Sequence, residues 1–348
     1  MSEVNNKSII TWLKKRKRII IAVLTIILII FMIFVVDFPN LLNKVILIGF
    51  WGTFLFVLAY TIAFHLRAYK LKLIFKGLNQ PIKYSTSYFS IGAAFGINDL
   101  TPGKVGDIAK IFIIKDQEDI RLSESVAGIA IERVLDLILL FIISCLALVY
   151  LYFGNINGTG NIIILGQSIQ FYLIIGAFLI LAVLIFFILL IYKTKFVLKI
   201  INKISKKLGY YLERFLYNFK QGIRKFKDHK RQLIYIIILG FPSWFFDASI
   251  IVIFFYFLGY NLNILVLILA SILLFFSKTF PITPGGWGIS ENIGALFIFI
   301  FYPGIPYVEI LSILVIEHLF RTAYLFFYGG YSIFHYNFKL KEARELVV

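Results

Sequence analysis

The stretch Thr283-Pro284-Gly285-Gly286-Trp287-Gly288 lies inside a long apolar region, where proline and glycine are expected to break a helix. The same pattern, Thr-Pro-Gly-x-x-Gly, begins at Thr101, 182 positions earlier (283 − 101). Each copy is followed by an apolar segment that carries acidic and basic residues, at 131–136 and at 316–321. The sequence therefore predicts two related halves, each with a broken membrane segment, and we expect the working site where the two breaks meet.

The composition is that of an integral membrane protein. Of 348 residues, 60% are hydrophobic and the mean hydropathy is +0.91, whereas apolar residues make up about half of a soluble protein. About 20 apolar residues suffice to cross the hydrocarbon core of a bilayer. We predict an all-α polytopic membrane protein with about six full spans plus two re-entrant broken helix pairs.

The formal net charge of +17 comes from basic residues concentrated in the loops between apolar runs. Anionic lipid at the cytoplasmic face explains this pattern better than nucleic acid does. The single cysteine, Cys145, excludes an internal disulfide and a cysteine metal cluster. We expect no metal, no cofactor and no nucleic-acid partner; membrane lipids, anionic phospholipid or lipid phosphate, are the expected partners, and a homo-oligomer is left open.

The first half begins with a basic cytoplasmic N-terminus at 1–18 and continues into one transmembrane domain at 19–338. A first span at 19–36 and a second at about 45–66 are expected, the latter returning to the cytoplasm because a run of basic residues follows: Arg67, Lys70, Lys72, Lys76 and Lys83. Residues 84–115 are too polar for a simple span and predict a re-entrant pair entered from the cytoplasm. A span at about 124–153 completes the first repeat, which covers about 45–153. A span at about 162–192 follows it.

Between the halves, residues 193–231 carry 13 basic against two acidic residues, interleaved with apolar ones. This mixture predicts cytoplasmic amphipathic helices on an anionic leaflet. The second repeat, about 232–335, contains a span at 232–258, a re-entrant pair at 262–280 and 289–303 entered from outside, and a last span at 307–335. A cytoplasmic tail, 339–348, ends the chain. The two repeats therefore have opposite orientations, as in many secondary transporters.

An unwound Thr-Pro-Gly-x-x-Gly segment at membrane depth leaves backbone groups without helical partners, and something polar must satisfy them. The helix that follows presents free N–H groups and a positive dipole end, which suit an anion such as a lipid phosphate. The alternative is a tight helix crossing without a ligand. The candidate substrate-binding residues in the breaks are Asn98, Thr101, Pro102, Gly103, Lys104, Gly106, Thr283, Pro284, Gly285, Gly286 and Gly288.

Ionisable residues inside spans are the other candidates, because each costs about 3 kcal/mol at the centre of a membrane helix. The repeat alignment places Asp136 opposite Arg321, which suggests that they neutralise each other; a static ion pair and direct substrate contact both remain open. The charged candidates are Asp107, Glu132, Arg133, Asp136, Lys278, Glu291, Glu317 and Arg321.

Signs of enzyme chemistry are few. The four histidines lack metal-ligand spacing, and no P-loop, Rossmann fingerprint or G-x-S-x-G elbow occurs. We expect a transporter rather than an enzyme. Two alternatives stay open: a polyprenyl-phosphate glycosyltransferase with catalytic carboxylates at Glu132 or Glu291, and a scaffold for a separate lipid-modifying enzyme.

Four motifs together resemble the lysylphosphatidylglycerol synthase transmembrane (flippase) family: N-D-L-T-P-G-K-V-G-D at 98–107, I-E-R-V-L-D-L at 131–137, P-I-T-P-G-G-W-G-I-S-E at 281–291, and the helix with Arg321. The resemblance covers about 15–335. It implies lipid handling, with flipping of phospholipid between leaflets. We expect a multi-pass protein of the cell membrane, and the basic flanks of the first and last spans predict that both termini are cytoplasmic. These residues contain no soluble aminoacyl-transferase domain, so synthesis of lysyl-lipid is not implied. Asp107 stands where the family has Glu, which keeps the charge but shortens its reach.

Overall fold

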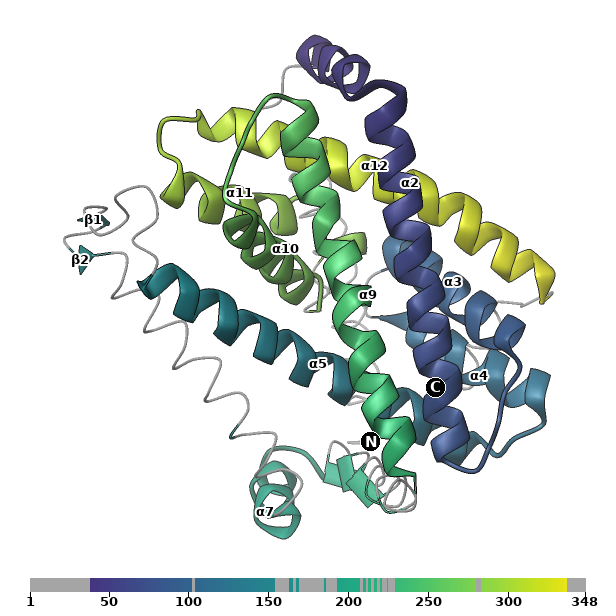
Figure 1. Cartoon of the computed structure of the whole chain (residues 1–348). Coiled ribbons are helices and arrows are strands. Elements are labelled where there is room, and N and C mark those ends of the chain that lie inside the picture. The colour runs from purple at the N-terminus through teal and green to yellow at the C-terminus, as the bar shows by residue number, and fades with distance from the viewer. Residues whose placement is uncertain are drawn as a thin grey trace, which may run out of the picture.

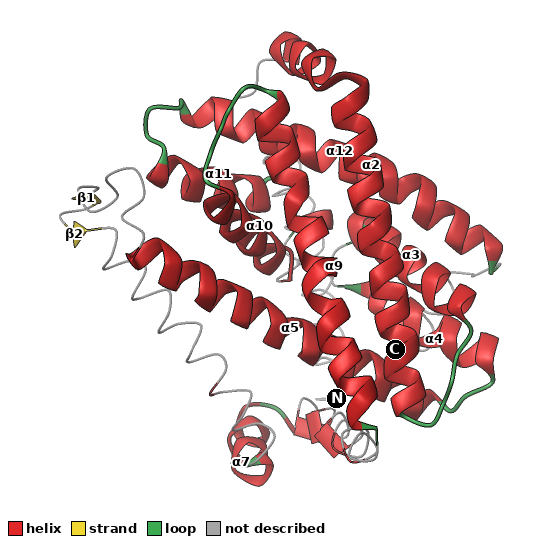
Figure 2. Ribbon diagram, in the orientation of Figure 1, coloured by secondary structure: helices red, strands yellow, loops and turns green. Residues whose placement is uncertain are grey.

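The computed structural model describes residues 38–101, 104–153, 163–164, 167–168, 185, 193–206, parts of 209–224, 229–279 and 283–336. Nearly all of them are helical, and long helices cross one another around a common centre (Figure 1). The strands β1 (Ile163–Ile164) and β2 (Gln167–Ser168) form one short antiparallel pair at the edge of the molecule (Figure 2). The predicted all-α membrane architecture is confirmed.

The same order of helices occurs twice. A long helix is followed by two short helices on either side of a break and then by a second long helix. In the first series these are α2 (Phe38–Gly77), α3 (Tyr84–Leu100), α4 (Val105–Glu118) and α5 (Leu122–Phe153). In the second they are α9 (Lys230–Phe257), α10 (Ile264–Thr279), the 3-10 turn η2 (Pro284–Gly286) with α11 (Ile289–Phe301), and α12 (Tyr307–His335). The helix α7 (Thr194–Ile204) lies between the two series.

The equivalent long helices α2 and α9 lie side by side and run in opposite directions (Figure 1). Near the start of α2, a Cβ on Gly52 would lie 3.2 Å from the ring of Phe257, at the end of α9. Farther along, Arg67 pairs with Asp247. Beyond the end of α2, the Asn79 side chain hydrogen-bonds to His229, which precedes α9, at 2.8 Å. The two helices are therefore antiparallel along their whole contact.

Helices α3 and α12 also pack antiparallel, and small residues allow their backbones to touch. A Cβ on Gly96 would lie 2.9 Å from the Cα of Gly329, closer than any side chain permits. The hydroxyl of Tyr328 donates to the carbonyl oxygen of Tyr88 at 2.6 Å. This crossing carries the middle of α12 to the C-terminal end of α3, where the first break begins.

Three helices in the described part of the chain are long and apolar enough to cross a membrane: Leu41–Gly77, Lys230–Phe257 and Tyr307–His335. The predicted spans at 19–36 and 162–192 lie outside the described residues. In α7, Val197 and Leu198 are buried while Lys195 and Lys199 are exposed, the two-faced pattern expected of an amphipathic helix.

The predicted end of the second span near residue 66 is wrong. Helix α2 continues to Gly77, and the first basic residues after the apolar run are inside the protein: Arg67 is 4% exposed and Lys70 is completely buried. The interpretation of both as cytoplasmic loop residues fails because no proline or glycine interrupts α2 between residues 53 and 76, so the helix carries their side chains into the packed interior.

Candidate functional site

The first break separates α3 from α4. Helix α3 ends at Thr101 because the backbone there is extended, with φ of −126° and ψ of 141°. The N–H and the hydroxyl of Thr101 both donate to the carbonyl oxygen of Ile97, at 2.9 and 2.6 Å. Lys104 adopts a left-handed backbone, with φ of 56°, and turns the chain into α4. Asn98 connects the two sides: its Oδ1 accepts from the N–H of Gly106 at 2.8 Å, and its Nδ2 donates to Asp107 at 3.3 Å. The side chain of Asn98 therefore satisfies a backbone donor that the break leaves free.

The second break lies between α10 and α11 and contains the 3-10 turn that starts at Pro284. The hydroxyl of Thr283 closes the turn by donating to the carbonyl oxygen of Trp287 at 2.9 Å. The carboxylate of Glu291 accepts the N–H at the start of α11 at 2.8 Å. Three residues have φ of 60–83°, a region that glycine enters without steric cost: Gly285, Gly286 and Gly288.

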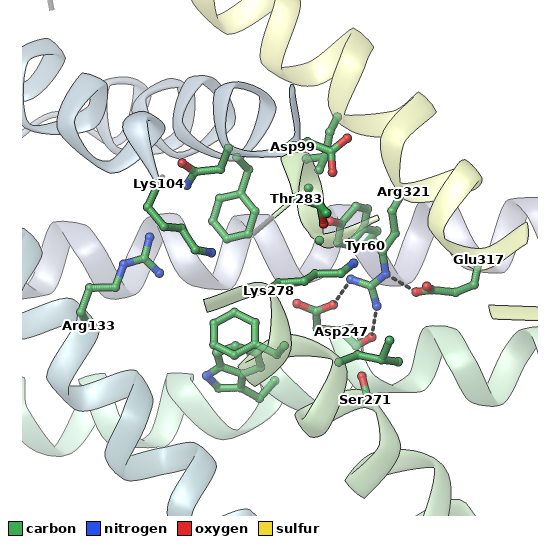
Figure 3. Close-up of a pocket in the computed structure, with 18 residues that line it drawn as sticks. Tyr60, Asp99, Lys104, Arg133, Asp247, Ser271, Lys278, Thr283, Glu317 and Arg321 are labelled. Atoms are coloured by element: carbon green, nitrogen blue, oxygen red, sulfur yellow. Dashed lines mark hydrogen bonds and ion pairs between the residues drawn. The ribbon is translucent and has the colours of Figure 1, made fainter. Parts of the chain in front are cut away.

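The two breaks meet. A Cβ on Gly285 would lie 2.8 Å from the carbonyl oxygen of Asp99, so the second break packs directly on the end of α3. A cavity opens between them, and side chains from both repeats point into it (Figure 3). Nine of the predicted site residues line this cavity: Asn98, Lys104, Arg133, Lys278, Thr283, Gly285, Gly286, Glu317 and Arg321.

A buried ion-pair network forms one wall of the cavity. Arg321 donates to the Asp247 carboxylate at 2.5 Å and to the Asp247 carbonyl oxygen at 3.1 Å, and it also pairs with Glu317. The second carboxylate oxygen of Asp247 pairs with Arg67. Two guanidinium groups and two carboxylates thus balance each other, and Asp247 joins α2, α9 and α12 at one point. Figure 3 shows the part of this network formed by Asp247, Arg321 and Glu317.

Lys104 and Lys278 differ from the other cations of the cavity. Both are half-buried. Among the described residues, neither ammonium group has a carboxylate within 4 Å or a hydrogen-bond acceptor. The Lys104 ammonium lies 5.9 Å from the centre of the Phe275 ring, and Figure 3 shows both lysines extending into the same space. Lys104 lies in the first break and Lys278 in the last turn of α10, directly before the second. The cavity therefore holds two ammonium groups without a close carboxylate partner, and Asp107, Asp99 and Glu291 act on them only at longer range.

The predicted pairing of Asp136 with Arg321 is wrong. The carboxylate of Asp136 pairs with Lys70 and accepts the indole N–H of Trp244 at 3.2 Å, whereas Arg321 binds Asp247 as described above. Each charge is neutralised by a residue of another helix in its own neighbourhood, so the repeat-equivalent positions do not meet.

Four predicted acidic residues do not line the cavity: Asp107, Glu132, Asp136 and Glu291. Glu132 accepts from the fully buried Lys110 at 2.6 Å, so this lysine is not free to hold a ligand. Glu291 pairs with His318, and Asp107 with Arg133. The other predicted residues shape the breaks, namely Thr101, Gly106, Pro284 and Gly288, while Pro102 and Gly103 lie outside the described residues.

The sequence prediction missed Asp247, Asp99 and Tyr60 in the cavity lining, and Arg67 and Lys70 in the network behind it. A signal for Asp247 was present, because a lone carboxylate inside an apolar span demands a partner. A signal for Arg67 and Lys70 was the absence of a helix breaker before Gly77.

The fold and the cavity define an α-helical membrane protein with a charged internal site built from two helix breaks. The chain belongs to the family described as the lysylphosphatidylglycerol synthase TM region, which matches residues 19–329. It is also 30% identical over 243 residues to the UPF0104 membrane protein MJ1078 of Methanocaldococcus jannaschii, a match that covers 67% of this chain and 91% of that protein. No solved structure matches. The family expected from the four motifs is confirmed.

Proposed function

We propose that this protein is a lipid transporter that moves an anionic lipid, a phospholipid or a polyprenyl-phosphate-linked lipid, between the leaflets of the cell membrane. The observation that carries the proposal is the pair Lys104 and Lys278, which face one cavity from the two sides and have no carboxylate within 4 Å among the described residues.

A charge held inside a membrane protein without a counter-charge is costly, and an anion that enters the cavity relieves this cost. Lys104 is also the residue before the first turn of α4, so a phosphate beside it lies near the positive end of the helix dipole. A hydrogen bond to a charged group contributes about 1.5–3 kcal/mol. Two ammonium groups and a helix end therefore suit a lipid phosphate.

The arrangement of the helices supports alternating access. Equivalent helices of two repeats run antiparallel when the repeats are inverted in the membrane, and α2 and α9 run antiparallel. In such proteins the substrate site lies at the interface of the repeats, and one repeat rocks against the other to open it to each side. The cavity lies at this kind of interface, because both breaks line it.

The glycosyltransferase alternative has less support. It requires a carboxylate at the substrate that is free to accept or donate a proton. Glu132 and Glu291, the two candidates, lie outside the cavity lining and are paired with Lys110 and His318.

The test is transport in proteoliposomes. Purified protein should accelerate the movement of fluorescent phosphatidylglycerol across the bilayer without nucleotide or sugar donor, and matched phosphatidylcholine should move much more slowly. Lys104→Gln and Lys278→Gln should each lower phosphatidylglycerol transport about tenfold, because one charge-assisted bond corresponds to at least about 1.4 kcal/mol. Lys76→Gln, at an exposed position at the end of α2, is the control of equal charge change and should transport at the parent rate.

Two results would contradict the proposal. If both cavity variants transport phosphatidylglycerol as fast as Lys76→Gln does, the lysines do not bind the headgroup. If the parent protein moves no anionic lipid but transfers sugar to a polyprenyl phosphate, the enzyme alternative is correct.

A further inference from the structure

A second, apolar groove adjoins the charged cavity. It lies between α5, α9 and α10, and its walls are hydrocarbon side chains that include Leu140, Ile143, Phe245, Ala248, Ile268 and Ile272. Phe245 is 57% exposed, so the groove reaches the outer surface of the helices. A groove of this composition attracts apolar ligands and offers nothing to a charged one.

The groove and the cavity share two wall residues, Trp244 and Ser271. Trp244 lies between the charged residues around the cavity and the apolar groove. Its indole N–H donates to Asp136 at 3.2 Å, and the guanidinium of Arg67 lies 5.1 Å from its ring centre. The ring also packs edge-on against Phe275, with centroids 4.5 Å apart. An apolar site and a cationic site are thus in contact through one buried side chain.

We propose that this groove holds a hydrocarbon chain of the same lipid whose anionic headgroup lies between Lys104 and Lys278. The inference rests on the proposed function for the headgroup and adds the site where the hydrocarbon chain of the lipid binds. Continuity of an apolar groove with a cationic cavity matches one class of ligand, an anionic amphiphile. A soluble anion needs no groove, and a neutral hydrocarbon gains nothing from two lysines.

Trp244 makes the groove measurable without altering it. Brominated acyl chains quench tryptophan fluorescence on contact, so the chain position can be read from lipid nanodiscs of phosphatidylcholine that contain a small fraction of dibrominated lipid. The contribution of Trp244 is the difference in quenching between the parent protein and Trp244→Phe. The contribution of Trp51 is obtained in the same way from Trp51→Phe and serves as the control, since Trp51 is 66% exposed on the outer face of α2.

Dibrominated phosphatidylglycerol should quench Trp244 at least twice as strongly as dibrominated phosphatidylcholine at the same fraction, whereas both lipids should quench Trp51 equally. The double variant Lys104→Gln/Lys278→Gln should remove the excess at Trp244, because the headgroup no longer holds the chain there. A high concentration of inorganic phosphate should also lower the additional quenching of Trp244, because free phosphate competes with the headgroup for the two lysines.

A second variant tests the groove from the other direction. Ala248→Leu fills part of it and should lower binding and transport of long-chain phosphatidylglycerol about tenfold, while binding of soluble dihexanoyl phosphatidylglycerol remains at the parent level. An equal loss of binding for the long-chain and the dihexanoyl lipid would mean that the substitution damages the cavity and not a chain site, and would count against the groove.

Three outcomes would overturn the inference. Equal quenching of Trp244 by both lipids would make the groove ordinary lipid-facing surface. No quenching of Trp244, with phosphatidylglycerol transport intact, would mean that protein fills the groove, and the proposed function would stand without it. An excess at Trp244 that persists in the double variant would separate the groove from the headgroup site. Failure of the proposed function itself is recognised differently, by the lysine variants in the transport assay.

Discussion

Asp247 is the residue whose replacement should cost the most stability near the cavity. Its carboxylate pairs with Arg67 and Arg321, and only Arg321 has a second carboxylate partner, Glu317. In Asp247→Asn, Arg67 loses its counter-charge while it remains 4% exposed, and one of its terminal nitrogens already lacks a hydrogen-bond partner among the described residues. The substitution therefore leaves a buried guanidinium uncompensated.

The magnitude follows from this geometry. Removing one partner of a buried ion pair costs about 3–5 kcal/mol. The rings of Phe64, Phe95 and Trp244, whose centres lie 5.1–5.5 Å from the Arg67 guanidinium, recover part of the loss through cation–π contact. We expect about 3 kcal/mol, which is more than about a hundredfold in the folding equilibrium.

The measurement is unfolding by sodium dodecyl sulfate in mixed micelles, followed by circular dichroism. Asp116→Asn is the matched control: it is the same chemical change in an ion pair with Lys115 whose side chains are 57% and 41% exposed, and it should cost less than about 1 kcal/mol. The double variant Arg67→Met/Asp247→Asn should recover much of the lost stability, because the stranded charge is removed.

The reasoning is refuted if Asp247→Asn costs no more than Asp116→Asn. The Arg67 guanidinium would then be solvated in the folded protein, and the network would not hold the three helices together. A double variant that sums the two single losses would show that Arg67 and Asp247 are not partners.

The crossing of α3 and α12 gives a second prediction: Gly329→Leu should destabilise the protein by several kcal/mol, because a Cβ there would lie 2.7 Å from the Cα of Gly96, whereas Gly330→Leu, which meets nothing within 4 Å, should be nearly neutral in the same unfolding assay. Equal losses would disprove the close backbone contact. The third prediction concerns topology: in a variant without the native cysteine, single cysteines at the exposed Gln117 and at Gly304, where the added side chain meets nothing within 4 Å, should react with an impermeant thiol reagent from opposite sides of the membrane. Labelling of both from one side would rule out inverted repeats.

The sequence by itself determined the membrane class, the family and most helix boundaries, because these depend on local chemistry. The last span predicted at 307–335 coincides with α12, which starts directly after Pro306. The two breaks lie where proline and glycine interrupt apolar runs, and no tertiary contact is needed to stop a helix there. Two matching breaks also predicted that the site lies where they meet, and nine predicted residues do line one cavity.

Only the tertiary structure decided which charges neutralise one another. A basic residue after an apolar run has the same local sequence whether it faces cytoplasm or a buried carboxylate, so Arg67 and Lys70 resembled a positive loop. Their partners, Asp247 and Asp136, lie 180 and 66 positions away and approach them only because α2 packs against α9 and α5. Lys104 and Lys278 were already candidates in the sequence, but only the packed helices distinguish them from the cations that have a close carboxylate, since ion pairing depends on distance in space and not on separation along the chain.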